Sequence, residues 1–267
     1  MLNQEKIINA VKNKGNSDSR MGAILMYGSF TQGCGDEYSD VEFYLFVKDD
    51  DIPSFDTEKW IEEIHPIFNH FYDEYGTEVV IFTNLVRGEF HFMPLSKIDI
   101  IDKLIVAGYF PDVQSMVLCD KYEKLQTVIR ALVENKVEYG KADAENIVNN
   151  LFSNILGGIN MYKRGEIARS MESLYFAHGY FLKAVRLLEG KTEHWLDPRK
   201  NLENEISQTW YSAFMSCTSS LDKDSIVKAY SNMVDNFRPM ISDLSDIYGI
   251  NSHKELFEKL EERLMSM

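Results

Sequence analysis

Two spacings of apolar residues alternate along the first half of the chain. Positions three or four apart predict helices over 2–13 and 57–75, the second with Trp60, Ile61 and Ile64 on one face. Continuous or alternating apolar runs predict buried strands, over 22–27, 41–47, 77–82 and 88–92. The order of these elements indicates a lobe in which helices pack on a sheet.

The second half of the chain has a different pattern. From about residue 122 glycine and proline become sparse and helical spacing dominates. The helices expected there span 122–138, 142–163, 166–189, 199–218, 223–247 and 252–265. This change of pattern predicts a domain boundary near residues 135–140. We therefore expect an α+β fold, with an α/β lobe built on a mixed sheet over 1–137 and a helical bundle over 138–267.

Charge and cysteine usage narrow the class of protein. The formal net charge of −14 argues against a nucleic-acid partner, because phosphate backbones are bound by clustered Lys and Arg. It favours cationic ligands, although acidity also serves solubility alone. The three cysteines suggest neither a disulfide framework nor a zinc site. The first 15 residues lack the features of a signal peptide and no run has about 18 apolar residues, so we expect a cytoplasmic protein with no membrane contact.

The chemically informative stretch lies between the first two strands. A buried strand ends at Gly28-Ser29, a glycine-rich loop of about ten residues follows, and Asp40 and Glu42 open the next strand. Side chains two apart on a strand point to the same face, so these carboxylates are presented together. Two carboxylates can hold Mg²⁺, and Ser29 with the loop glycines supplies donors to a polyphosphate.

This pattern resembles the nucleotidyltransferase superfamily related to DNA polymerase β. The segments MYGSFTQGCGDEYSDVEFY, YGTEVVIF, RGEFHF, KRGEIARS and NLENEIS are similar to the B-type lincosamide nucleotidyltransferases over essentially the whole chain. The resemblance implies a catalytic domain over 1–137 and a helical domain for substrate binding and dimerisation over 138–267. It also implies transfer of AMP from ATP to a hydroxyl of a lincosamide such as lincomycin or clindamycin, with release of pyrophosphate.

The resemblance assigns roles to three carboxylates. Asp40 and Glu42 are the expected ligands of two Mg²⁺ ions, a pair that can stabilise both the attacking and the leaving oxygen of an in-line displacement. Glu89, on a later strand, is expected to take the proton from the acceptor hydroxyl. Gly28 and Ser29 are expected to bind the nucleotide phosphates.

Four further residues are candidates for substrate or nucleotide binding, and three of them also have a simpler structural explanation. Lys163 and Arg169 in the helical half are expected to face the phosphates, but long basic side chains on helices are usually solvated. His91 shares a strand face with Glu89 and is expected to orient substrate, although a buried histidine with satisfied hydrogen bonds is the commoner case. Tyr44, like Tyr75, is a candidate wall of the drug pocket.

The sequence leaves open the roles of further acidic residues and two alternative functions. Glu78 fits either the cleft or a solvated strand edge, and the run 49–51 is expected to be a solvated turn. An aminoglycoside nucleotidyltransferase would also suit an acidic cleft. A non-catalytic regulator of the same fold could dispense with the third carboxylate, which is present here as Glu89.

Overall fold

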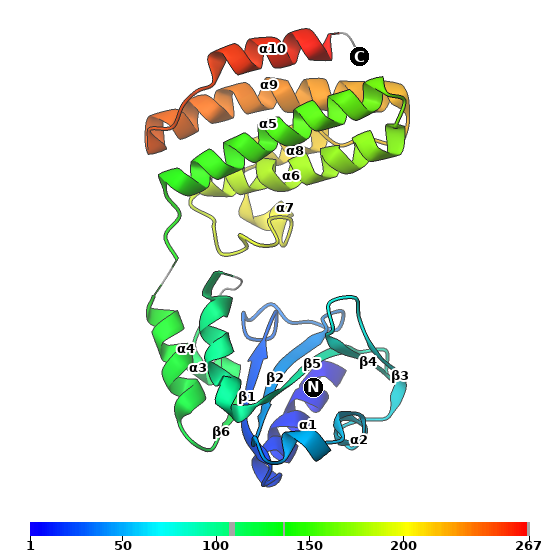
Figure 1. Cartoon of the computed structure of the whole chain (residues 1–267), viewed down its shortest axis with the longest axis vertical. Coiled ribbons are helices and arrows are strands. Elements are labelled where there is room, and N and C mark those ends of the chain that lie inside the picture. Colours follow the sequence, from blue (N-terminus) through cyan, green and yellow to red (C-terminus); the bar gives the residue numbers. More distant parts are fainter. Residues whose placement is uncertain (107–109, 136, 266–267) are drawn as a thin grey trace. The chain divides into compact units, whose positions relative to one another are not determined.

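The computed structural model describes residues 1–106, 110–135 and 137–265. They form two compact units, Met1–Val137 and Glu138–Met267, drawn in Figure 1. A mixed sheet with helices in the first unit and packed helices in the second give the predicted α+β class. The roles expected of the two units stay predictions. Within the described ranges, no helix combines the length and apolar character that a bilayer crossing needs.

The first unit is built on one six-stranded sheet. Its strands are β1 (Met21–Tyr27), β2 (Val41–Val47), β3 (Ile67–Tyr72), β4 (Glu78–Phe82), β5 (Arg87–Pro94) and β6 (Val117–Asp120). Their order in space is β3-β4-β5-β2-β1-β6. Neighbouring strands are antiparallel except β2 and β5, which are parallel. This exception determines how the candidate site is assembled.

The two faces of the sheet have separate cores. Helices α1 (Asn3–Ser17) and α2 (Thr57–Glu62) contribute buried residues such as Val11 and Trp60 to the first core. The second core contains residues from the 3-10 helix Leu95–Val106, α3 (Val113–Met116) and α4 (Lys124–Glu134). Phe46 of β2 is buried in this second core. Because strand side chains alternate, Glu42 and Tyr44 point to the same face as Phe46.

The prediction of one helix over 57–75 is wrong beyond residue 62. Helix α2 ends there, Pro66 follows, and β3 pairs antiparallel with β4. Proline has no backbone N–H and disfavours helical geometry in the residue before it, so the helix stops although the apolar spacing continues. Phe68, Phe71 and Tyr72 are aromatic residues typical of strands, and they are largely exposed on this edge strand.

Short elements between 95 and 120 were not predicted. The 3-10 helix, α3 and β6 are brief or lack a clean period, so the hydrophobic pattern does not reveal them. The expected helix over 199–218 is in fact two, α7 (Leu202–Glu205) and α8 (Gln208–Ser216). Ser207 separates them because its side chain caps the backbone N–H of Trp210.

The described residues of the second unit form α7, α8 and four further helices. These are α5 (Lys141–Lys163), α6 (Ile167–Glu189), α9 (Lys223–Tyr248) and α10 (Lys254–Leu264). Helices α5 and α6 form an antiparallel pair that packs on α9 (Figure 1). Arg186 is fully buried beside this core and donates to Glu205 and to three backbone carbonyls of residues 191–200. It therefore fixes the segment that leads into α7.

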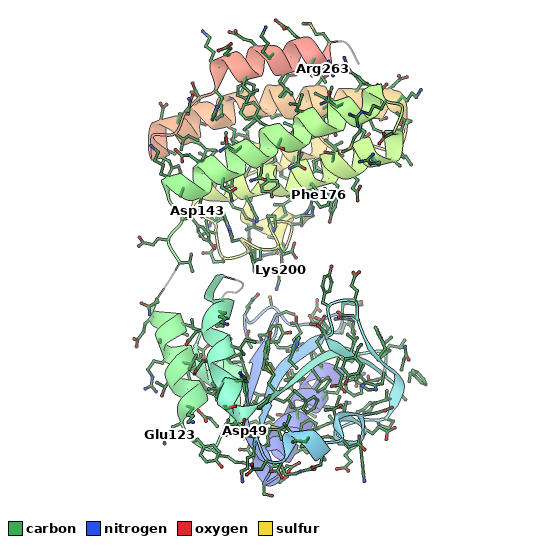
Figure 2. All side chains as sticks on the ribbon, in the orientation of Figure 1. Asp49, Glu123, Asp143, Phe176, Lys200 and Arg263 are labelled. Carbon is green, nitrogen blue, oxygen red and sulfur yellow. The ribbon has the colours of Figure 1, made fainter. Side chains whose placement is uncertain are left out.

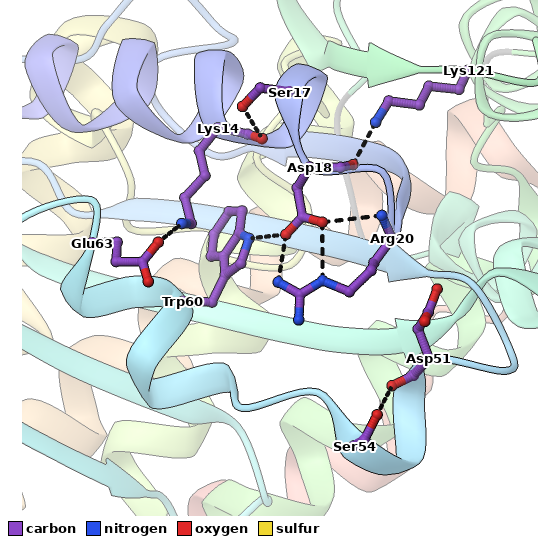
Figure 3. A network of polar contacts seen from close by, with 9 residues as sticks. All are labelled: Lys14, Ser17, Asp18, Arg20, Asp51, Ser54, Trp60, Glu63 and Lys121. Atoms are coloured by element: carbon purple, nitrogen blue, oxygen red, sulfur yellow. Dashed lines mark hydrogen bonds and ion pairs between the residues drawn. The ribbon is translucent and has the colours of Figure 1, made fainter.

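A polar network joins α1, the start of β1 and α2 in the first unit (Figure 3). Arg20 donates to both carboxylate oxygens of Asp18, at 3.0 and 2.7 Å, and Trp60 Nε1 donates to Asp18 at 3.2 Å. Lys14 pairs with Glu63 alongside. The hydrogen bonds from Arg20 are the main reason that the pKa of Asp18 is lowered to about 2.

We predict that Asp18→Asn lowers the free energy of unfolding by about 1 kcal/mol at pH 7, a value reduced for solvent screening. The folded-state pKa lies below the unfolded one, so this stabilisation is present above pH 4 and is lost as the pH falls toward 2. Urea unfolding of both proteins at pH 7 and pH 3 checks this. The exposed Asp102→Asn is the control. A difference from wild type that is the same at both pH values would contradict the prediction.

Candidate active site

Three polar side chains lie in one row across the middle of the sheet. Glu42 of β2 is directly opposite Tyr27 in the antiparallel pair with β1. It is also in register with Glu89 in the parallel pair with β5. Residues in register on neighbouring strands carry Cβ atoms about 5 Å apart on the same face. The fold therefore brings Glu42 and Glu89 together although 46 residues separate them in sequence.

Asp40 and Arg87 lie beside this row, two residues before Glu42 and Glu89 along their strands. Asp40 precedes β2 and Arg87 is the first residue of β5. One guanidinium nitrogen, Arg87 Nη1, lies 3.1 Å from Asp40 Oδ2 and 2.6 Å from Glu89 Oε1. The charges and hydrogen bonds of the two carboxylates outweigh the effect of partial burial and raise the pKa of Arg87 above its ordinary value. A permanent positive charge thus lies between two of the three predicted site carboxylates.

Gly28 supports the carboxylate of Glu42. Its φ of +83° is a left-handed conformation that favours glycine. A Cβ atom at this position would lie 1.7 Å from Glu42 Oε2, so the carboxylate packs directly against the glycine. The N–H and hydroxyl of Thr31 both donate to the carbonyl of Gly28, and the carbonyl of Ser29 accepts from Gln32 and Cys34. These bonds close the loop after β1 into a tight turn.

A group of aromatic rings lies two residues further along β2 and β5 than Glu42 and Glu89. Tyr44 and His91 are in register on β2 and β5, and their rings stack with centroids 4.4 Å apart. Tyr27 completes the group, with its ring 5.5 Å from that of Tyr44. Burial lowers the pKa of His91 below its ordinary value, partly offset by the charge of Glu89. The imidazole is therefore neutral near pH 7.

Tyr27 connects the ring group to the carboxylates. Its hydroxyl lies 3.0 Å from His91 Nε2 and 3.3 Å from Glu89 Oε2. Burial, with the charges of Glu42 and Glu89, raises the pKa of Tyr27, so its proton stays in place. The hydroxyl donates to Glu89, and neutral His91 with its proton on Nε2 can donate to the hydroxyl oxygen. Glu89 is then held at Oε1 by Arg87 and at Oε2 by Tyr27.

A polar hollow of about 740 Å³ opens beside Asp40 and Arg87. It is lined by residues 1–4, the loop 37–40 and the turn 84–87, all in the first unit. The buried amide of Gln4 donates to the carbonyls of Glu37 and Ser39, which fixes one wall. The hollow is large enough for part of a nucleotide or a small-molecule substrate.

The donor chemistry of Asp40 and Glu42 fits a magnesium site that is shared with a nucleotide. Proteins usually bind Mg²⁺ through one or two carboxylates, and phosphate oxygens and water complete the octahedron. Within the described residues, no group of three or more His, Cys, Asp or Glu side chains is arranged as a metal cage. A site with two carboxylates does not require such a cage. Arg87 already neutralises part of the charge of Asp40.

Other predicted residues lie apart from this group. Glu78 is neither in the cleft nor at a solvated edge, because it is 4% exposed and accepts from Thr57 Oγ1 at 2.6 Å and contacts His70 Nε2 at 2.7 Å. Tyr75 is exposed in the turn between β3 and β4. Asp49 lies low in the first unit in Figure 2, in an exposed turn where Ser96 donates to it.

Lys163 and Arg169 lie on either side of the turn between α5 and α6. Lys163 is the last residue of α5, Arg169 is in the first turn of α6, and both are exposed. Arg169 pairs with Glu166. Both belong to the second unit, and their role toward phosphates stays a prediction.

Two residues of the candidate site, Arg87 and Tyr27, were not predicted from the sequence. Tyr27 ends the strand that leads into Gly28-Ser29, and Arg87 begins the strand that carries Glu89. A basic residue two positions before a predicted catalytic carboxylate shares its strand face, and this signal was available in RGEFHF. Tyr27 carried no such signal, because its partners come from β5 and become neighbours only through the register of β2.

Part of the chain matches the model of a known protein family. Residues 140–263 match the family described as "Lincosamide nucleotidyltransferase-like, C-terminal domain". No curated protein sequence matches the chain significantly.

Two solved structures are similar at a low level. An aminoglycoside 6-adenyltransferase from Bacillus subtilis has 13% sequence identity and a TM-score of 0.45, and the alignment covers 98% of this chain and 96% of that one. A nucleotidyltransferase-like protein from Exiguobacterium sibiricum 255-15 has 12% identity and a TM-score of 0.41, with 91% and 77% covered.

The family match spans nearly all of the second unit. The second unit therefore matches the C-terminal domain of lincosamide nucleotidyltransferase-like proteins, and this match supports an enzyme of the nucleotidyltransferase type.

Proposed function

We propose that this protein transfers AMP from ATP to a hydroxyl of a lincosamide and releases pyrophosphate. Nucleotidyltransferases of this kind use ATP and a divalent metal ion. The observation that carries the proposal is the row of Glu42 and Glu89 beside Asp40, on an enzyme whose second unit matches the lincosamide nucleotidyltransferase-like family. The net charge of −14 suits a drug whose amine is protonated near neutral pH.

Asp40 and Glu42 are the proposed metal ligands. When bound, two Mg²⁺ ions lower the pKa of the attacking hydroxyl and stabilise charge on the entering and leaving oxygens. Asp40 has 37% of its side chain exposed and borders the polar hollow, so its carboxylate is accessible to a nucleotide. The side chain of Glu42 is held in position by the turn at Gly28.

Glu89 is the proposed general base. Its side chain is 22% exposed, which leaves an oxygen accessible to an acceptor hydroxyl while most of the group is shielded. Tyr27 donates to Glu89 Oε2, so the carboxylate needs little further ordering during the reaction. Proton removal by a positioned carboxylate contributes about 10²–10⁴-fold to such reactions.

Binding of the two substrates is assigned to residues around this row. Gly28 and Ser29 contact the phosphates, and Lys163 and Arg169 of the second unit supply positive charge to them. Tyr44 and His91 form a stacked wall of aromatic rings that suits the apolar part of the drug. The family resemblance supports a cytoplasmic homodimer in which the helical unit takes part in substrate binding.

The first prediction concerns the reaction itself. Lincomycin or clindamycin incubated with the protein, Mg²⁺ and ATP is expected to gain the mass of one AMP group, with one pyrophosphate released for each modified drug. Mass spectrometry and a pyrophosphate assay measure the two products. Kanamycin and streptomycin serve as parallel acceptors. Transfer to the aminoglycosides alone would reject the lincosamide assignment, and transfer to neither class would reject the proposal as a whole.

The second prediction separates the roles of the carboxylates. Asp40→Asn is expected to abolish transfer, because it removes a negative charge from the proposed metal site. Glu89→Gln is expected to lower kcat by roughly 100-fold or more with little change in KM, as removal of a general base does. Thermal unfolding verifies that each variant is folded. An effect of Glu89→Gln on KM alone would assign this residue to binding.

The third prediction tests the support that Gly28 gives to Glu42. Gly28→Ala is expected to lower kcat by more than tenfold, because the new Cβ would displace the Glu42 carboxylate that it meets at 1.7 Å. Gly76→Ala, in the turn between β3 and β4, is the matched control. Its φ of +80° imposes similar backbone strain, but its Cβ meets no atom within 4 Å. Equal losses of activity in the two variants would mean that strain, and not the position of Glu42, is responsible.

A further inference from the structure

Arg87 has no role in the reaction as proposed so far, yet it contacts two of the three site carboxylates directly. Its Nη1 donates to Asp40 at 3.1 Å and to Glu89 at 2.6 Å, which joins a proposed metal ligand to the proposed base. Two carboxylates that lie this close repel each other unless a cation lies between them. Arg87 is therefore an internal cation of the site.

We infer that Arg87 is a displaceable counter-ion that makes release of the base depend on binding of a divalent cation. In the nucleotide-free enzyme its guanidinium holds Asp40 and Glu89. When Asp40 takes part in binding a divalent cation, repulsion moves the guanidinium away, and Glu89 Oε1 becomes available to the acceptor hydroxyl. This inference rests on the proposed function, because it uses the same carboxylates.

The geometry permits this movement. Arg87 keeps 42% of its side chain exposed and lines the polar hollow of about 740 Å³, so the guanidinium has space to enter without unfolding its strand. Its backbone is fixed by the pairing of β5, and only the side chain has to move. A guanidinium in this hollow can bind phosphate oxygens through its fork of N–H donors.

The arrangement also protects the base before substrates arrive. While Arg87 donates to Glu89 Oε1 and Tyr27 donates to Oε2, both oxygens of the carboxylate have a partner. Glu89 Oε1 then becomes available to the acceptor hydroxyl only after a divalent cation has bound, which limits wasteful activation of water.

The test measures metal binding without nucleotide or drug. Arg87→Met is expected to tighten binding of Mn²⁺, measured by titration of the free-ion EPR signal, by about tenfold, because a competing unit charge a few ångströms away is removed. The exposed Arg130→Met on α4 removes the same charge from the same unit and is expected to leave Mn²⁺ affinity unchanged. Arg87→Gln provides a second variant if the Met variant does not fold.

A direct readout distinguishes displacement from simple repulsion. The ¹⁵N guanidinium resonance of Arg87 is identified as the one that is missing in Arg87→Met. It is expected to shift when the wild type is titrated with Mg²⁺ alone, and the midpoint of this shift is expected to equal the midpoint of metal binding. An unchanged resonance at saturating Mg²⁺, or unchanged Mn²⁺ affinity in Arg87→Met, would overturn the inference. Failure of wild type and Arg87→Met alike to bind Mn²⁺ would instead overturn the metal site of the proposed function.

Discussion

The parallel pairing of β2 with β5 is the constraint on which the candidate site depends. All other neighbouring strands of the sheet are antiparallel, and this pair alone places Glu42 beside Glu89 and Tyr44 beside His91. A slip of one residue would turn Glu89 to the opposite face, where Phe90 packs in the core with α1 and α2. Burial of Phe43 and Phe90 on that face therefore fixes the register, and the apolar core positions the carboxylates.

The cost of gathering negative charge at this point is offset by groups from the same strands. Arg87 lies between two carboxylates, and Tyr27, in the same row as Glu89, donates to that carboxylate. Both partners come from strand ends whose positions are set by the sheet, so they need little additional ordering. Tyr27 is in turn held by His91, whose neutral ring adds no charge to the cluster. Part of the negative charge of the site is thus neutralised before any ligand arrives.

The sequence predicted the strands that carry Glu42 and Glu89 better than it predicted the elements around them. The strands with Asp40, Glu42 and Glu89 have strong apolar runs beside a distinctive Gly-Ser turn, and these signals are local. The helix expected over 57–75 failed because aromatic residues spaced like a helix also suit an edge strand, and Pro66 decides between them. Contacts such as those of Tyr27 and Arg87 depend on pairing between distant segments, which a single sequence does not display.

Arg87 gives the acidic cluster two states that differ in which cation neutralises it. A guanidinium is always charged and carries its donors on a mobile side chain, so it can stabilise Asp40 and Glu89 without blocking a later exchange. Lysine would provide the charge as a strongly hydrated point without the planar fork that suits phosphate oxygens. A fixed apolar neighbour would leave two partly buried carboxylates uncompensated. An arginine at the first position of β5 meets both requirements, because its backbone is anchored in the sheet while its side chain borders the hollow.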